Sequence, residues 1–196
     1  LVTLCSPSLV WGQFTKGNLI VEQVGNGTSL SSAAFAISLV ETNSSGSVNQ
    51  TITNQFTGTN LLTESGSATS NGQFNSYGSY LAIPGYNSAI STSGVASTNT
   101  KATNILDSTT NVINRVVFPT SGTPLPFTAN NFRSIIPTSN TTFYASGSCN
   151  GTGCTSGGIW YFDGTNYTQV TTSTYNSRNV EIYTGNLYYS TGSGTQ

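Results

Sequence analysis

The sequence predicts an all-β fold made of β-propeller-like repeats, each a four-stranded antiparallel blade. Residues 131–147 (NFRSIIPTSNTTFYASG) align without a gap with residues 176–192 (NSRNVEIYTGNLYYSTG). Short runs of β-branched and aromatic residues alternate with Gly- and Asn-rich turns, and helical patterns are almost absent. Repeats of about 40–50 residues with four short strands are typical of propeller blades. A β-sandwich is the alternative, since it would show similar strands, but it requires no gapless repeat.

Each repeat contains a characteristic strand that runs into a Gly turn. We expect four such strands, within GNLIVEQVGNG (17–27), GSYLAIPGYN (78–87), NTTFYASGSCN (140–150) and GNLYYSTGSG (185–194). In the two aligned copies, a further strand precedes it, in NFRSII and NSRNVEIY.

Three of these strands are followed by a segment that predicts a strand, a turn and a second strand. The three segments are residues 33–52, 114–127 and 157–170. The third contains Asp163-Gly164 between two apolar runs, which is typical of a type I′ hairpin. The segment at 32–40 has some helical character, but its β-branched residues and the turn beside it favour a strand.

The two ends of the chain give the expected domain organisation. Residues 1–12 resemble the tail of a secretory signal peptide, with an apolar stretch and a small residue before a cut at Gln13. The alternative is that residues 1–11 form the first strand of the mature protein. Residues 13–196 then form a partial propeller, with about three blades and the start of a fourth. We therefore expect a fragment of a secreted protein.

Charge is scarce, and this excludes several classes of partner. Charged residues make up 6% of the chain, against roughly 25% in typical domains, and the net charge is −1. Because the five basic residues are scattered, we expect no nucleic-acid binding. No run of eighteen apolar residues is present, so we expect no membrane span. Retained aromatics (11%) argue against disorder and favour an extracellular, turn-rich β protein.

The cysteines and the Asn-x-Ser/Thr sequons fit an oxidising, secretory environment. Cys149 and Cys154 bracket the turn CNGTGC, and we expect a disulfide between them. A metal pair is the alternative, but the chain has no His to complete a zinc site. The candidate N-glycosylation sites are Asn26, Asn43, Asn49, Asn140, Asn150 and Asn166.

Catalytic and cofactor motifs are missing from the sequence. The absence of His excludes Ser-His-Asp and Cys-His arrangements. Only six carboxylates are present, and nothing in their spacing brings two of them together as a glycosidase pair requires. No phosphate-binding, dinucleotide-binding or EF-hand motif occurs, so we expect neither a cofactor nor enzymatic activity within these residues.

Three arginines are the candidate contact residues. Arg133 and Arg178 occupy the same position in successive repeats, and Arg115 lies near a related motif. They either line a channel and grip an acidic or sugar ligand, or bond neighbouring blades together, and the second role is favoured for a repeated position. We likewise expect the aromatic residues Trp160, Tyr161, Tyr188 and Tyr189 to pack in the core rather than to stack on sugars.

Several segments, in this order, resemble a family of secreted, largely uncharacterised β-propeller-like repeat proteins. The segments are NGTSLSSAAFAISLVE, ATSNGQFNSYGSYLAIPGYN, NRVVF, NNFRSII and NSRNVEIYTGNLYYSTGSG. The resemblance covers about residue 14 to the end, to the N-terminal half of that family. It implies secretion and a propeller, and it implies no established activity.

Together these features predict a non-catalytic, secreted or cell-surface propeller module that binds a glycan, a matrix component or an extracellular protein. One alternative is a structural subunit of an extracellular filament or coat, because an apolar N-terminal segment can add a strand to an open sheet edge of a neighbour. A further alternative is part of a secreted hydrolase whose active site lies outside this fragment.

Overall fold

The chain folds into short strands joined by turns, and the predicted all-β class is confirmed. The computed structural model describes residues 14–53, 56–98, 100–110, 112–122, 125–150, 154–171 and 176–192. The predicted signal-peptide segment, residues 1–12, lies outside these ranges. The strands are β1 (Leu19–Val24), β2 (Ala34–Thr42), β3 (Val48–Ile52), β4 (Thr63–Ser65), β5 (Asn75–Tyr77), β6 (Tyr80–Tyr86), β7 (Lys101–Asp107), β8 (Val112–Val117), β9 (Phe132–Pro137), β10 (Phe143–Gly147), β11 (Gly158–Phe162), β12 (Tyr167–Gln169), β13 (Ser177–Tyr183) and β14 (Asn186–Thr191). The helical elements described are the short 3-10 turns η2 (Gly58–Asn60) and η3 (Val95–Ser97).

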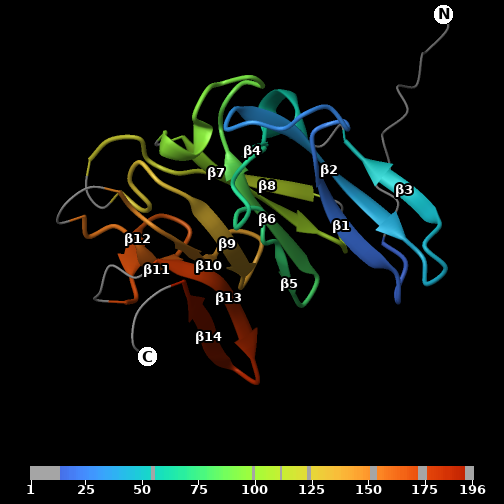
Figure 1. The fold of residues 1–196 in the computed structure, drawn as a ribbon. Coiled ribbons are helices and arrows are strands. Elements are labelled where there is room, and N and C mark those ends of the chain that lie inside the picture. Colours follow the sequence, from blue (N-terminus) through green and yellow to red (C-terminus); the bar gives the residue numbers. More distant parts are fainter. Residues whose placement is uncertain are drawn as a thin grey trace, which may run out of the picture.

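The strands form three sheets, and no sheet closes on itself within the described residues. The first sheet has the order β1-β2-β4-β6-β7-β8, with β3 also paired to β2 and β5 also paired to β6. The second is the consecutive meander β9-β10-β11-β12, and the third is the hairpin β13-β14. All pairs of named strands are antiparallel. Figure 1 shows these groups following one another in space as they do in sequence, from the blue β1–β3 to the red β13 and β14.

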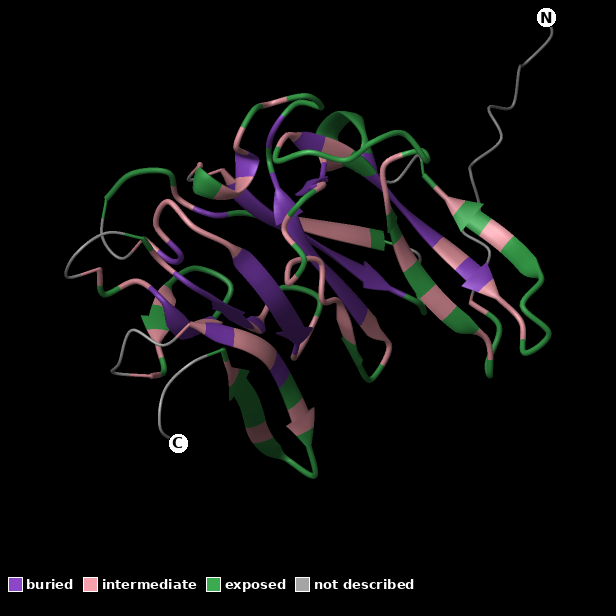
Figure 2. Cartoon of the chain, viewed as in Figure 1, coloured by how far each residue is buried: buried purple, intermediate pink, exposed green. Residues whose placement is uncertain are grey.

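Alternation along each central strand divides its side chains between two cores. On β9, Ile135 faces the core shared with β6 and β7, whereas Ile136 faces the core shared with β13. On β6, Ala82 belongs to the first of these cores, and its neighbour Ile83 packs toward β2 and β4. Because successive side chains of a strand point to opposite faces, a strand covered on both faces is buried at nearly every position. Figure 2 shows this as continuous purple along β6, β7 and β9.

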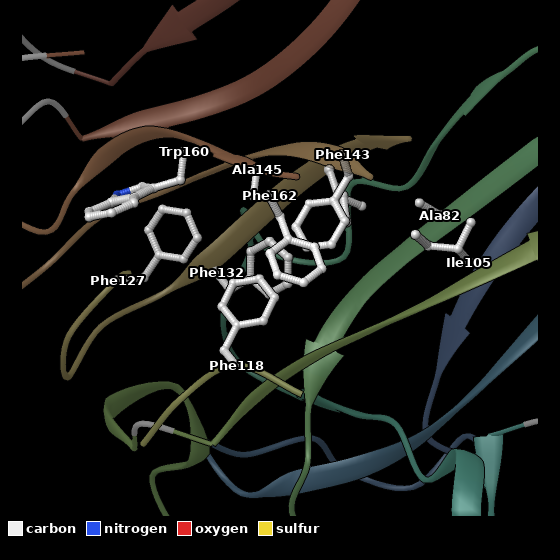
Figure 3. Close-up of a cluster of buried hydrophobic side chains, with 10 residues drawn as sticks. Ala82, Ile105, Phe118, Phe127, Phe132, Phe143, Ala145, Trp160 and Phe162 are labelled. Carbon is white, nitrogen blue, oxygen red and sulfur yellow. The ribbon is translucent and has the colours of Figure 1, made fainter. Parts of the chain in front are cut away.

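The largest core is a cluster of aromatic rings between the first and second sheets (Figure 3). Phe118 lies at its centre, with ring centroids 5.0 Å from Phe132, 5.9 Å from Phe143 and 5.0 Å from Tyr167. Tilted and offset ring pairs at these separations add stabilisation beyond the apolar area that they bury. The predicted core position of Trp160 is confirmed, since it is buried in the same cluster.

All four predicted characteristic strands are present, as β1, β6, β10 and β14. The hairpins predicted at 33–52 and 157–170 are also confirmed, as β2–β3 and β11–β12. The prediction for 114–127 was wrong, because β8 pairs backward with β7 and residues 118–122 and 125–127 contain no strand. Phe118 and Phe127 in this segment instead fill the aromatic cluster from irregular backbone.

The turn between β11 and β12 is not the type I′ turn that Asp163-Gly164 predicts. Asp163 does not adopt a positive φ; its Oδ1 instead accepts hydrogen bonds from the backbone N–H groups of Thr165 and Asn166. A two-residue turn with positive φ at both positions occurs at Thr184 (47°) and Gly185 (79°), between β13 and β14. These are the backbone angles that a type I′ turn needs.

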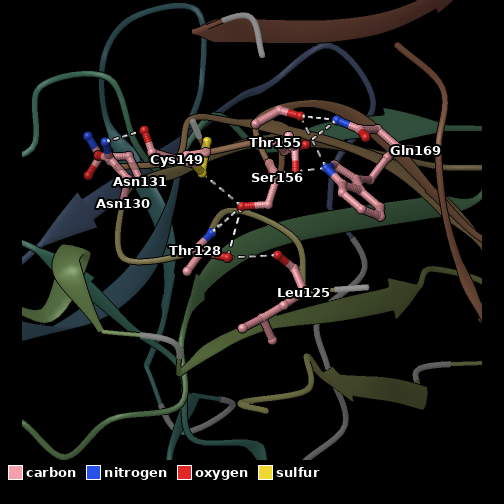
Figure 4. Close-up of a disulfide and its surroundings, with 11 residues drawn as sticks. Leu125, Thr128, Asn130, Asn131, Cys149, Thr155, Ser156 and Gln169 are labelled. Atoms are coloured by element: carbon pink, nitrogen blue, oxygen red, sulfur yellow. Dashed lines mark hydrogen bonds between the residues drawn. A yellow bond between two sulfur atoms is a disulfide. The ribbon is translucent and has the colours of Figure 1, made fainter. Parts of the chain in front are cut away.

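The disulfide between Cys149 and Cys154 is confirmed, with 6.1 Å between the two Cα atoms. It follows β10 and lies beside a network of hydroxyl groups (Figure 4). There Ser156 Oγ donates to Thr128 Oγ1 at 2.8 Å, and the Ser156 carbonyl accepts from the Trp160 indole at 3.1 Å. The bridge therefore fixes a loop that supports the aromatic cluster.

Candidate functional site

Polar side chains concentrate where β5, β9 and β13 lie side by side. Each strand contributes one polar residue whose side chain hydrogen-bonds to a neighbouring strand: Asn75 on β5, Ser134 on β9 and Asn179 on β13. Asn75 Nδ2 donates to Ser134 Oγ at 3.0 Å and to the carbonyl of Val180 at 3.2 Å, while Ser134 Oγ donates to Asn179 Oδ1 at 2.8 Å. A parallel bridge between Gln73 and Ser134 continues this contact. Successive strand groups are thus joined by side-chain hydrogen bonds across their first strands.

Two carboxylates line one pocket near this region, although their spacing in the sequence does not bring them together. Glu22 on β1 and Glu64 on β4 both line a cavity of about 200 Å³, together with Asn71. Glu22 occupies an inward position between Ile20 and Val24, since alternate residues of β1 face the core. We call Glu22, Glu64 and Asn71 the acidic pocket.

Burial dominates the electrostatics of the acidic pocket. Glu64 is 2% exposed, and burial raises its pKa to about 8 even though the Ser65 N–H and the Asn71 amide donate to Oε1. Burial, followed by repulsion from Glu64, raises the pKa of Glu22 well above its usual range. Within the described residues, Glu64 Oε2 and both carboxylate oxygens of Glu22 have no hydrogen-bond partner.

The acidic pocket is continuous with a second buried charge. Asn71 Nδ2 donates to the Tyr86 hydroxyl at 2.6 Å, and burial, followed by the charge of Glu64, raises the pKa of that hydroxyl. The preceding residue, Ser70, accepts a hydrogen bond from Arg133 Nη1, and Arg133 Nη2 donates to Ser148 Oγ at 3.2 Å. One loop thus contacts the acidic pocket through Asn71 and an arginine through Ser70.

The structure brings together two of the three predicted arginines. Burial, followed by the nearby positive charge of Arg178, lowers the pKa of Arg133 to about 10. Arg178 is half-buried and lies against Gly192. Arg115 is elsewhere, on β8, where it donates to Asn104 Oδ1 at 3.2 Å and to Asn87 Oδ1 at 2.9 Å. We call the acidic pocket with Tyr86, Arg133 and Arg178 the polar strip.

The other predicted residues lie apart from the polar strip. The sequon residues Asn26, Asn49, Asn140, Asn150 and Asn166 are exposed and Asn43 is half-buried, so their use as glycosylation sites stays a prediction.

The core prediction fails for two aromatic residues. Tyr188 and Tyr189 on β14 are 54% and 44% exposed, because that strand pairs only with β13 among the described strands. Tyr161 is half-buried and its ring centroid lies 4.7 Å from that of Tyr144.

One of the two carboxylates, Glu22, had a recognisable sequence pattern around it. A charged residue at an inward position of an otherwise apolar strand, as in Ile20-x-Glu22-x-Val24, has to find a partner or a function. Glu64 follows Leu61 and Leu62 and belongs to a strand too short to show alternation. Its meeting with Glu22 depends on the pairing of β2 with both β1 and β4.

Comparison with known families, curated proteins and solved structures gives no match for this chain. No helix in the described parts of the chain is long and apolar enough to cross a membrane.

Proposed function

We propose that this chain is part of a secreted or cell-surface β-propeller that binds an extracellular ligand without transforming it. The ligand class is a glycan, a matrix component or a protein. The carrying observation is the polar strip, in which two carboxylates line one pocket and two arginines lie near each other on β9 and β13. Binding sites typically place a few polar groups of this kind on a rigid scaffold.

The strand arrangement supports the propeller assignment. β9–β12 form a consecutive antiparallel meander, and β5–β8 pair in the same order. Their first strands, β5 and β9, lie beside each other, and Gln73, just before β5, makes a parallel bridge with Ser134 of β9, which is how neighbouring blades would run around a channel. Arg133 and Arg178 then recur at the same place on successive blades.

The geometry of the acidic pocket favours binding over hydrolysis. Glycosidases place two carboxyl groups on either side of a sugar bond, so both must be reachable by substrate. The unpartnered oxygens of Glu22 and Glu64 are buried among the described residues, and no His is available as a base. A hydrolase active site within these residues is therefore not supported.

The test is a screen of the secreted full-length protein on glycan and matrix-protein arrays. Arg178→Gln is expected to weaken binding at least about tenfold, the loss expected for one charged contact. Arg115→Gln, which lies outside the polar strip, is the matched control and should bind as the wild type does. Equal binding by both variants, or release of cleaved product from the array, would contradict the proposal.

Assembly into a filament or coat is the second candidate function, because several described strands have an open edge. Among the described strands, β1 pairs only with β2 and β14 pairs only with β13. β1 also exposes Leu19 (63%) and Val21 (43%) on its outer face. Open edges of this kind accept a strand from another chain. Concentration-dependent growth in light scattering, abolished by Val21→Lys, would favour this function.

A further inference from the structure

The acidic pocket contains more hydrogen-bond acceptors than the surrounding protein satisfies. Both carboxylate oxygens of Glu22, Oε2 of Glu64 and Oδ1 of Asn71 are buried and have no hydrogen-bond partner within the described residues. All three residues line the same cavity of about 200 Å³. Buried polar atoms are almost always paired in folded proteins, so four orphaned oxygens in one cavity indicate a missing positively charged or donor group.

The donors that contact Glu64 are already engaged, and the nearby donor left without a partner, Arg133 Nε, belongs to a residue that does not line the cavity. The Ser65 N–H and Asn71 Nδ2 both donate to the other oxygen of Glu64, Oε1, at 2.8 and 3.1 Å. Arg133 directs its terminal nitrogens to Ser70 and Ser148 rather than into the cavity. A Cβ atom at Gly72 would lie 3.0 Å from Glu22 Oε1. The backbone at Gly72 thus passes close to this carboxylate, and the glycine contributes no side chain that could pair with it.

We propose that the acidic pocket binds one Ca²⁺ ion. The unpartnered atoms are all oxygens, which are the ligands of hard cations rather than of Zn²⁺. Glu22 can supply two of them, with Glu64 and Asn71 supplying one each, and Ca²⁺ accepts such irregular sets completed by water. The two carboxylates, when ionised, carry two negative charges, which match the charge of one Ca²⁺.

The ion would have a structural role that does not depend on the ligand of the polar strip. It would join β1 through Glu22, β4 through Glu64 and the following loop through Asn71. These elements meet at the point where the sheet passes from β2 through β4 to β6. Ca²⁺ binding is therefore expected to stabilise the fold by binding the native state alone.

The test is calorimetric titration of the EDTA-treated full-length protein with CaCl₂ and, separately, MgCl₂. We expect one Ca²⁺ per chain, with a dissociation constant of about 10⁻³ M or tighter, as in extracellular modules, and weaker binding of Mg²⁺. The melting temperature should rise with Ca²⁺. Tb³⁺ in place of Ca²⁺ should show tyrosine-sensitised emission that falls in Tyr86→Phe, since the Tyr86 hydroxyl contacts Asn71.

Variants separate loss of the site from loss of the fold. Glu22→Gln and Glu64→Gln should each lose Ca²⁺ binding by at least about 100-fold, because each removes a charge from the ion. In EDTA they should melt at or above the wild-type temperature, because each replaces a buried carboxyl group that has an oxygen without a hydrogen-bond partner. Glu181→Gln, at an exposed position of β13, is the matched control and should bind Ca²⁺ normally.

Two results would overturn the proposal. One is a wild type with neither a Ca²⁺ heat nor a thermal shift. The other is unchanged Ca²⁺ binding in both glutamate-to-glutamine variants. Array binding should be measured both in EDTA and in Ca²⁺. Because the array scores the ligand contacts of Arg178 independently, it distinguishes failure of the Ca²⁺ proposal from failure of the proposed function.

Discussion

Asn75→Ala should be one of the most destabilising polar substitutions in the chain. Its side-chain amide donates to Ser134 Oγ at 3.0 Å, to the Ile135 carbonyl at 2.9 Å and to the Val180 carbonyl at 3.2 Å. A single amide group thereby connects β5 to both β9 and β13. Removing it leaves two backbone acceptors unsatisfied between packed strands.

The magnitude follows from these three contacts. A neutral hydrogen bond contributes about 1 kcal/mol net, and a buried acceptor left without a partner costs about 1–3 kcal/mol. Because one amide cannot make three ideal bonds at once, the expected loss in the free energy of unfolding is about 2–4 kcal/mol. Asn179→Ala removes one contact, to Ser134 Oγ, and should cost about 1 kcal/mol.

The assay is urea unfolding followed by tryptophan fluorescence, with equal slopes required for comparison of the variants. A double-mutant cycle of Asn75→Ala with Ser134→Ala should return a coupling energy of about 0.5–3 kcal/mol, as expected for residues in contact. If Asn75→Ala costs no more than Asn179→Ala, the inference that Asn75 connects three strands is refuted.

Three further predictions concern the core, a buried cation and the disulfide. Phe118→Ala should lower the free energy of unfolding by about 3–5 kcal/mol, whereas Val112→Ala, at an exposed position, should change it by less than about 0.5 kcal/mol; equal effects in urea unfolding would contradict the packing. Burial lowers the pKa of Lys101 from 10.5 to about 8. Between pH 8 and 10.5 the unfolded chain therefore binds more protons than the folded chain. As the pH rises through this range, the wild type should gain about 3 kcal/mol of stability relative to Lys101→Met. A flat difference between the two melting curves from pH 8 to 10.5 would disprove it. Replacing Cys149 and Cys154 by Ser should cost about 2 kcal/mol, because the closed loop is short; an unchanged melting temperature under oxidising conditions would disagree.

Local features of the fold could be predicted from the sequence because they depend on residues close in the chain. The strand β11 and its hairpin follow from an apolar run that ends at Asp163-Gly164. The strand β2 follows from β-branched residues beside a turn. In both cases the turn chemistry and the apolar pattern point to the same structure.

The segment 114–127 was predicted incorrectly because apolarity does not distinguish a strand from a loop that packs into a core. Phe127 has a positive φ of 57° and is fully buried in the aromatic cluster. The actual hairpin partner of β8 precedes it, across a turn without glycine. In that turn Asp107 Oδ1 accepts a hydrogen bond from the Thr109 N–H at 2.8 Å. The residue types of the turn did not suffice to predict this hairpin from the sequence.

The candidate site depends on contacts between distant segments, which explains why only part of it was predicted. The equivalence of Arg133 and Arg178 follows from the repeat, and their proximity follows from neighbouring copies. Glu22 and Glu64 belong to no common repeat position. Only the register of β1 and β4 on β2 brings them to one cavity, and register is set by tertiary packing.

The glycines that end β10 and follow β14 have a consequence for how the two aligned segments, 131–147 and 176–192, can differ in sequence. A Cβ atom at Gly147 would lie 2.5 Å from the Asn131 carbonyl oxygen, and one at Gly192 would lie 2.4 Å from Arg178 Nε. Asn131 and Arg178 lie in the segment aligned between the copies, so each glycine is constrained by its own copy. A library randomised at these two codons and selected for secretion should recover glycine at both, whereas the exposed Tyr189 should accept many residues. The two aligned segments can therefore differ at most positions and still require glycine at the last one, because the space there excludes a Cβ atom.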